Sequence, residues 1–186
     1  MTYFQVQSLQ ETTISSGEIQ DFLFDMIQQE FGYGYIPDYH QDIQHIADYY
    51  LKPAGNDFLL AVDNAHEKLI GTIGIRAYDK DFPLFKDIYH PHSTASIWRV
   101  FVSKSWRRKG VASTLVNIGE DFCQKKGYEN IYLHTHRTVP GSLNFWLAQG
   151  YNITVDTENE MGTVHMEKQL NNPVDREAAE KCEIYI

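Results

Sequence analysis

The apolar positions of the chain follow either the alternating spacing of a strand or the three-to-four-residue spacing of a helix. The first 51 residues change from the strand spacing to the helical one. Residues 3–9 alternate apolar and polar side chains, which is typical of a strand with one buried face. At residue 15 a Ser-Ser-Gly-Glu sequence typical of a capping box precedes apolar residues at helical spacing, and Gly32 and Gly34 end that segment. Residues 43–51 repeat the helical spacing. This part of the chain therefore predicts a strand followed by two amphipathic helices.

The remaining pattern alternates between strands and helices. Two apolar segments joined by Asp-Asn-Ala-His-Glu predict a hairpin over residues 57–62 and 68–78, and a long loop follows over residues 79–94. Later segments with strand character cover residues 96–102, 130–136, 151–155 and 163–170, and those with helical spacing cover residues 111–126 and 142–150. This order predicts a mixed α/β sheet with helices on its faces.

Composition narrows the class of protein. At 186 residues, with 42% apolar and 22% charged residues, the chain suits one globular domain, which we expect over residues 1–170, with a tail over 171–186. The net charge of −9 argues against a general nucleic-acid binder, and an apolar run of about 18 residues, as a membrane span needs, is missing.

Cysteine usage and the N-terminal residues indicate a cellular setting. Cys123 and Cys182 have neither the number nor the spacing of a disulfide framework or a zinc site, and the first ten residues lack the basic and apolar blocks of a signal peptide. We therefore expect a reducing, cytoplasmic setting and no metal. The sequence leaves the oligomeric state open, a homodimer included.

A cationic cluster lies between the strand expected over 96–102 and the helix that begins near Val111. Four cations fall within six residues, Lys104, Arg107, Arg108 and Lys109. At a helix N-terminus each cation is unfavourable by about 0.3–1 kcal/mol. A bound anion would reverse this effect, because free backbone N–H groups of Gly110, Val111, Ala112 and Ser113 and the positive helix end both attract negative charge. Alternatively, the cations point into solvent or pair with distant carboxylates. Their position directly between strand and helix favours a diphosphate site.

A family resemblance supports the same assignment. Residues 99–115, Arg-Val-Phe-Val-Ser-Lys-Ser-Trp-Arg-Arg-Lys-Gly-Val-Ala-Ser-Thr-Leu, resemble the acetyl-CoA signature of the GNAT superfamily of N-acetyltransferases. The core pattern [Q/R]-x-x-G-x-[G/A] is met by Arg107, Gly110 and Ala112, and Phe-Trp-Leu-Ala-Gln-Gly-Tyr over 145–151 resembles a second family motif. The resemblance implies a GNAT fold, whose mixed, mostly antiparallel sheet is splayed at the cofactor site with helices on both faces.

The resemblance also implies roles for individual residues. Acetyl-CoA would be the co-substrate. Its pantetheine arm would lie along the strand residues, its diphosphate would lie in the basic loop, and its sulfur would lie near the later helix. The cofactor-binding residues implied are Val100, Phe101, Val102, Arg107, Arg108, Lys109, Gly110, Val111, Ala112, Ser113, Asn144 and Trp146.

The reaction that the resemblance implies is direct attack of a primary amine on the thioester. Histidine titrates near neutral pH, so His134 and His136 are candidate bases, although a strand-end histidine is more often a surface residue. Trp146 stands where many relatives have a proton-donating tyrosine, and an indole N–H is far too weak an acid for that task. Tyr132, Tyr151 or water could replace it; we assign Tyr151 as the candidate.

The acceptor side is less defined. Glu30 and Asp42 could bind a cationic substrate, and Tyr33 and Tyr35 would line the acceptor side by resemblance. We expect a small-molecule amine acceptor. A protein amine acceptor, an acyl-CoA-binding sensor without activity, and a nucleotide-binding module that uses the same loop remain alternatives.

Overall fold

The computed structural model describes residues 3–170, so the predicted tail over 171–186, with Cys182, lies outside the described residues. The strands are β1 (Phe4–Ser8), β2 (Asp57–Asp63), β3 (Leu69–Ala77), β4 (Thr94–Val102), β5 (Asn130–His136), β6 (Asn152–Asp156) and β7 (Thr163–Gln169). The helices are α1 (Ser16–Phe31), α2 (Pro37–Gln44), α3 (Ile46–Tyr50), α4 (Val111–Lys125) and α5 (Ser142–Ala148), with short 3-10 turns η1 (Pro83–Phe85) and η2 (Lys104–Trp106).

The strands form one seven-stranded sheet in the order β1-β2-β3-β4-β5-β7-β6. Antiparallel pairing joins β1 to β2, β2 to β3, β5 to β7 and β6 to β7. Parallel pairing joins β4 to β5 over Thr94–Ser96 and Asn130–Tyr132. The predicted mixed, mostly antiparallel sheet is confirmed, and so is the predicted hairpin of β2 and β3.

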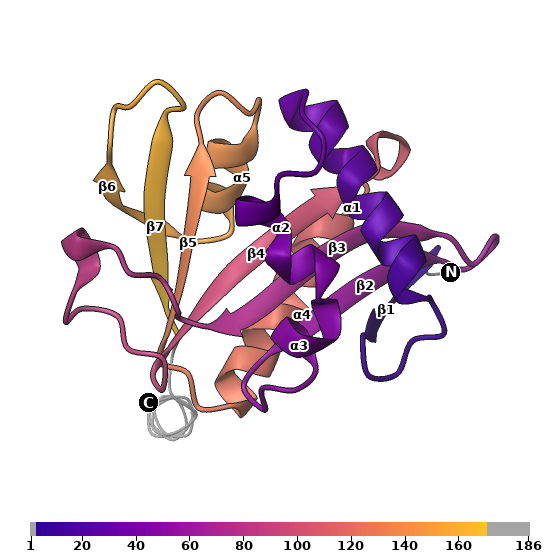
Figure 1. Ribbon diagram of the computed structural model, residues 1–186, viewed down its shortest axis with the longest axis horizontal. Coiled ribbons are helices and arrows are strands. Elements are labelled where there is room, and N and C mark those ends of the chain that lie inside the picture. Colours follow the sequence, from indigo (N-terminus) through magenta and orange to yellow (C-terminus); the bar gives the residue numbers. More distant parts are fainter. Residues whose placement is uncertain (1–2, 171–186) are drawn as a thin grey trace, which may run out of the picture. The chain divides into compact units, whose positions relative to one another are not determined.

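The described residues fall into two compact units, residues 3–76 with 97–119 and residues 77–96 with 120–170. In the first unit, α1, α2 and α3 cover one face of the strands (Figure 1). The buried side chains of this layer are Ile19, Leu23, Ile27, Ile43, Ile46, Tyr50, Phe58, Leu60 and Val62. The periodic apolar residues that predict these helices therefore form their buried side.

The first turns of α4 cover the opposite face of β3. A Cβ on Gly71 would lie 3.0 Å from a methyl of Val111, and a Cβ on Gly119 would lie 3.1 Å from Ile75. Successive side chains of a strand point to opposite faces, and Gly74 accordingly meets Tyr50 on the other side, where a Cβ would lie 2.8 Å from its ring. Helix and strand approach closely at these glycines, and helices lie on both faces.

The second unit has its own apolar centre. Tyr78, Phe85, Tyr89 and Tyr132 form a buried aromatic cluster, with Phe82 packed against it. The loop predicted over residues 79–94 is therefore anchored on β5 by its aromatic side chains. Its last residue, Thr94, already belongs to β4, so the strand begins two residues before the predicted start.

The segment after α1 also differs from the expected single helix. Pro37 begins α2 six residues earlier than the apolar spacing predicts, and His45, at φ −120°, separates α2 from α3. His40 interrupts α2 with a non-helical backbone at φ −124° and ψ 20°. Its Nδ1 accepts a hydrogen bond from the Ile36 N–H at 2.9 Å, which stabilises the start of α2 through a side chain rather than through the backbone pattern.

Candidate functional site

Two residues of the loop between β4 and α4 depart from the ordinary backbone conformations. Arg108 and Gly110 both have left-handed conformations, with φ of 59° and 83°. Left-handed residues inside a turn curl the backbone so that successive N–H groups converge on a concave surface. The Thr114 N–H donates to the Gly110 carbonyl at 2.9 Å as a regular helical bond. The N–H groups of the first turn therefore point out of the helix end, as in any α-helix.

The cations of this loop divide into two kinds. Arg107 forms an ion pair with Glu30 of α1, and its Nε donates to the Val102 carbonyl at 3.1 Å. Pairing with a distant carboxylate, the alternative noted from the sequence, is thus found for Arg107. Lys104, Arg108 and Lys109 are exposed, and the Lys109 ammonium, next to the start of α4, lies 4.9 Å from the centre of the Trp106 ring. Arg108 and Lys109 are therefore the cations best placed to meet an anion.

The strand before this loop contains an unusual residue. Arg99, in β4, has a φ of 50°, although side-chain-bearing residues rarely adopt the left-handed region. Its carbonyl accepts a hydrogen bond from Thr72 Oγ1 at 2.8 Å. A left-handed residue inside a strand interrupts the regular ladder and turns the following backbone in a new direction. The residues redirected are Val100, Phe101 and Val102, the ones implied to bind the pantetheine arm.

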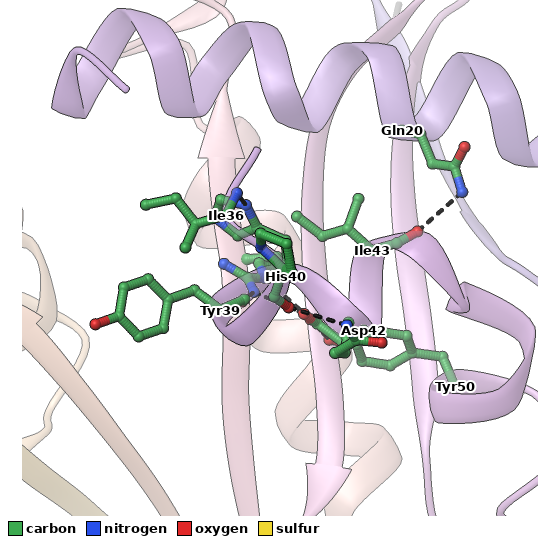
Figure 2. Close-up of polar contacts among 10 residues, drawn as sticks. Gln20, Ile36, Tyr39, His40, Asp42, Ile43 and Tyr50 are labelled. Carbon is green, nitrogen blue, oxygen red and sulfur yellow. Dashed lines mark hydrogen bonds and ion pairs between the residues drawn. The ribbon is translucent and has the colours of Figure 1, made fainter. Parts of the chain in front are cut away.

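The Arg99 side chain joins β4 to α2. It forms an ion pair with Asp42, and Asp42 also accepts the Tyr50 hydroxyl at 2.8 Å (Figure 2). Burial alone would raise the pKa of Asp42, but the hydrogen bonds and charge of Arg99 outweigh it and hold that pKa below its usual value. The Asp42 carboxylate is therefore ionised and engaged inside the protein.

Aromatic side chains surround the connection between α1 and α2. Tyr33 and Tyr35 are 36% and 47% exposed, and both pack against the buried His40, Tyr33 in a stacked arrangement at 6.2 Å. Burial first, and then the nearby Arg99, lower the pKa of His40, so its imidazole is neutral at pH 7. Glu30, also expected on the acceptor side, faces Arg107 instead. The two tyrosines thus form an exposed aromatic surface that packs on the buried, neutral imidazole of His40.

In the second unit, the candidate bases lie on one face of β5. His134 and His136 alternate with buried residues, and His134 stands opposite His165 of β7 in the register. The Tyr132 hydroxyl and His165 Nδ1 are 2.7 Å apart. Burial lowers the pKa of His136, and burial followed by the charge of Lys80 lowers that of His165. Both imidazoles are therefore neutral at pH 7, the form in which a base accepts a proton.

The residues expected near the sulfur have contrasting environments. Asn144 of α5 is exposed, whereas Trp146 is 5% exposed and its ring packs at 5.1 Å against Tyr151. Burial, and then the Glu120 carboxylate, raise the pKa of Tyr151 well above its usual value. A hydroxyl with a raised pKa releases its proton less readily than a free tyrosine does. The assigned roles of these residues stay predictions.

Several of these residues carry no local sequence signal. Arg99, His40 and His165 are missing from the expected site because their importance comes from partners far along the chain. Asp42, expected from the sequence as a possible ligand of a cationic substrate, is buried and paired with Arg99 instead. Within residues 3–170, no cluster of three or more histidine, cysteine or acidic side chains is arranged to hold a metal ion. No helix in that range has the length and apolarity needed to cross a membrane.

Comparisons with known proteins agree with this geometry. The sequence profile of the Acetyltransferase (GNAT) family matches residues 21–151. Probable N-acetyltransferase 14 of Xenopus tropicalis is 33% identical over 63 residues, 34% of this chain and 31% of that protein. N-acetyltransferase 8B of Rattus norvegicus is 26% identical over 115 residues, 62% of this chain and 48% of that protein. The chain thus matches between about a third and a half of these relatives' length.

Solved structures share the fold at low sequence identity. A GNAT-family acetyltransferase of Staphylococcus aureus Mu50 has a TM-score of 0.71 and 19% identity, over 90% of this chain and 99% of that one. An aminoglycoside 6'-N-acetyltransferase complexed with coenzyme A has a TM-score of 0.64 and 15% identity, over 90% and 97%. The family profile covers most of the chain and the fold agrees with it, so the chain belongs to the GNAT family of acetyltransferases.

Proposed function

We propose that the protein is an N-acetyltransferase that moves the acetyl group of acetyl-CoA to a primary amine of a small molecule. The observation that carries the proposal is the loop between β4 and α4, where two left-handed residues, a helix N-terminus and exposed cations coincide. This combination provides both the backbone donors and the charge that a diphosphate requires.

The residues fit acetyl-CoA at two points. Gly110, Val111, Ala112 and Ser113 would offer backbone N–H groups to the diphosphate, and Arg108 and Lys109 would add charge. The redirected backbone of β4 after Arg99 would bind the pantetheine arm in the manner of an added strand. Arg107 would act indirectly, since its side chain already binds Glu30 and the Val102 carbonyl.

The reaction is a balanced acyl transfer. The neutral amine attacks the thioester carbon, so a C–N bond forms and the C–S bond breaks. The amine loses one proton, for which His134 or His136 is the proposed acceptor, directly or through water. The leaving thiolate gains one proton, which solvent can supply. A backbone N–H on β4 would stabilise the negative charge that develops on the acyl oxygen.

The names of the relatives favour a small acceptor. N-acetylaspartate synthetase of Rattus norvegicus is 28% identical to this chain over 96 residues, and an aminoglycoside acetyltransferase shares the fold. Aspartate and aminoglycosides are both small molecules with amino groups. A protein amine remains the alternative acceptor, and the cytoplasmic location and the oligomeric state stay predictions.

The proposal is tested by removing the two cations that directly precede Gly110 and the start of α4. The double variant Arg108→Gln with Lys109→Gln should weaken CoA binding by at least about tenfold at low salt, because each lost charge contact contributes on the order of 1 kcal/mol. Isothermal titration calorimetry at two salt concentrations measures this loss. Lys125→Gln with Lys126→Gln is the matched control, since it removes the same charge from the other end of α4.

Two outcomes decide between the candidates. Equal CoA affinity in wild type and the Arg108/Lys109 double variant would overturn the diphosphate site. Tight CoA binding without thiol release from acetyl-CoA on any of a panel of small amines and peptides would favour the acyl-CoA sensor. Release with peptides alone would favour a protein acceptor.

A further inference from the structure

The left-handed backbone of Arg99 is costly, and the structure shows what maintains it. Glycine adopts this conformation without steric penalty, whereas an arginine does not. Arg99 nonetheless has a φ of 50° in the middle of β4. Outliers of this kind persist only where the surroundings over-determine them, and they concentrate at functional sites.

The surroundings that hold Arg99 come from α2. Its Nε donates to Asp42 Oδ2 at 3.0 Å and its Nη2 to Asp42 Oδ1 at 2.6 Å, a two-point contact with fixed geometry. The same Nη2 donates to the Tyr39 carbonyl at 2.5 Å. The Arg99 and Asp42 side chains are 14% and 4% exposed, so solvent competes little with this contact.

Two further residues, Tyr50 and Arg76, fix the Asp42 carboxylate. Its Oδ2 accepts the hydroxyl of Tyr50, which is fully buried and lies directly on Gly74 of β3. The guanidinium of Arg76, stacked between Tyr49 and Trp98, adds a second positive charge near the carboxylate. Asp42 therefore cannot move without disturbing both β3 and α3.

The backbone of Arg99 is held at a second point. Thr72, a buried residue of β3, donates its hydroxyl to the Arg99 carbonyl at 2.8 Å. Side chain and carbonyl are thus held independently, which fixes the orientation of the peptide that leads into Val100. This is the start of the segment that, under the proposed function, meets the acyl group and the pantetheine arm.

Stability alone does not account for the contact. A buried ion pair often contributes little net stability, because desolvating both charges offsets their attraction. A glycine at position 99 would adopt the same backbone without any partner. What the ion pair adds is the contact that keeps an arginine, which disfavours this backbone, in the left-handed conformation.

We propose that Asp42 is a positioning residue that clamps Arg99 in its left-handed conformation, so that the backbone after it donates a hydrogen bond to the acyl carbonyl of acetyl-CoA. The inference rests on the proposed function, since it assumes that acetyl-CoA binds along β4. It predicts that loss of Asp42 weakens recognition of the acyl group more than recognition of CoA itself.

The isosteric variant Asp42→Asn tests the clamp. Infrared spectroscopy of protein-bound, ¹³C-labelled acetyl-CoA without amine should show a carbonyl band at lower frequency than in water for wild type. In the variant this band should return toward its frequency in water. The ratio of acetyl-CoA to CoA affinity should fall toward one, since acetyl-CoA affinity falls more than CoA affinity, and kcat should fall by about 10- to 100-fold.

Two variants at position 99 separate the effect of the backbone conformation from the effect of losing the arginine side chain. Arg99→Gly removes the guanidinium but adopts the left-handed backbone freely, whereas Arg99→Ala removes it and disfavours that backbone. The carbonyl band of Arg99→Gly should stay near the wild-type frequency, and that of Arg99→Ala should shift as in Asp42→Asn. These two variants keep the proposal testable if Asp42→Asn does not fold.

The outcomes are distinguishable from failure of the proposed function. A wild-type carbonyl band in folded Asp42→Asn, or in both Arg99→Gly and Arg99→Ala, would overturn the clamp while leaving the acetyltransferase proposal intact. A wild-type protein that binds neither CoA nor acetyl-CoA would overturn the proposed function, and the clamp with it.

Discussion

Arg99 and Asp42 stand 57 positions apart in the chain, and neither belongs to a motif that pairs them. Asp42 precedes Ile43, the first apolar position of an expected amphipathic helix, so its spacing is compatible with either face. The helix boundary decides the matter. Because α2 begins at Pro37 and is interrupted at His40, Asp42 turns into the protein toward β4. Long-range partners of this kind are what sequence patterns leave open.

The ionised state of Asp42 predicts a specific pH dependence of stability. Its pKa is lower in the folded protein than the unfolded value of about 3.9, so its contribution is complete above that value. The contribution is lost as pH falls through the folded pKa. The free energy of unfolding of wild type minus that of Asp42→Asn should therefore shrink on acidification below about pH 4, by at most about 1.4 kcal/mol per pH unit.

Urea unfolding at pH values between about 5 and 3 measures this difference. The Asn variant serves as its own baseline, because other carboxylates titrate in both proteins and cancel. A difference that stays constant over this range would show that Asp42 is not held ionised by Arg99.

At the scale of elements, the sequence predicted the helices and strands with regular apolar spacing well. It did not predict the segments whose apolar spacing is irregular. The capping box of Ser15 and Glu18 begins α1, Gly32 ends it in a left-handed conformation, and β5 has the predicted bounds. Each of these signals is local. The aromatic residues between β3 and β4 have no regular spacing, so their packing on Tyr132 was not predictable from the sequence.

The contact between β3 and α3 gives a packing prediction. Gly74→Ala should lower the free energy of unfolding by about 1–3 kcal/mol, because the new methyl would lie 2.8 Å from the Tyr50 ring. Tyr50 cannot yield easily, since it is fully buried and bonded to Asp42. Chemical denaturation followed by circular dichroism measures the loss.

A second glycine provides the control for this substitution. Gly17, in the exposed first turn of α1, has its nearest neighbouring atom at 3.9 Å, so Gly17→Ala should leave stability unchanged or raise it by at most about 1 kcal/mol. Equal effects of the two substitutions would contradict the close contact of Gly74 with Tyr50.

At the scale of the whole molecule, positive charge is concentrated in one loop of a chain that is negatively charged overall. The chain carries a net charge of −9, yet Arg108 and Lys109 are exposed beside the helix end that would meet an anionic ligand. Because four cations within six residues contrast with an acidic chain, the loop is recognisable from the sequence alone. The acceptor offers no such contrast, because no comparable run of like-charged residues marks the segments proposed to bind it.

Ligand binding to the whole chain distinguishes acetyl-CoA from a plain nucleotide. A ligand that binds only the folded state stabilises it by about 2.7 kcal/mol at 100 times its dissociation constant. CoA at that concentration should raise the free energy of unfolding by this amount in wild type. ATP carries phosphates but no pantetheine arm, so at the same concentration it should raise it much less. Equal stabilisation by both ligands would mean that the loop recognises phosphates alone, as a nucleotide-binding module does, and that β4 after Arg99 takes no part in binding.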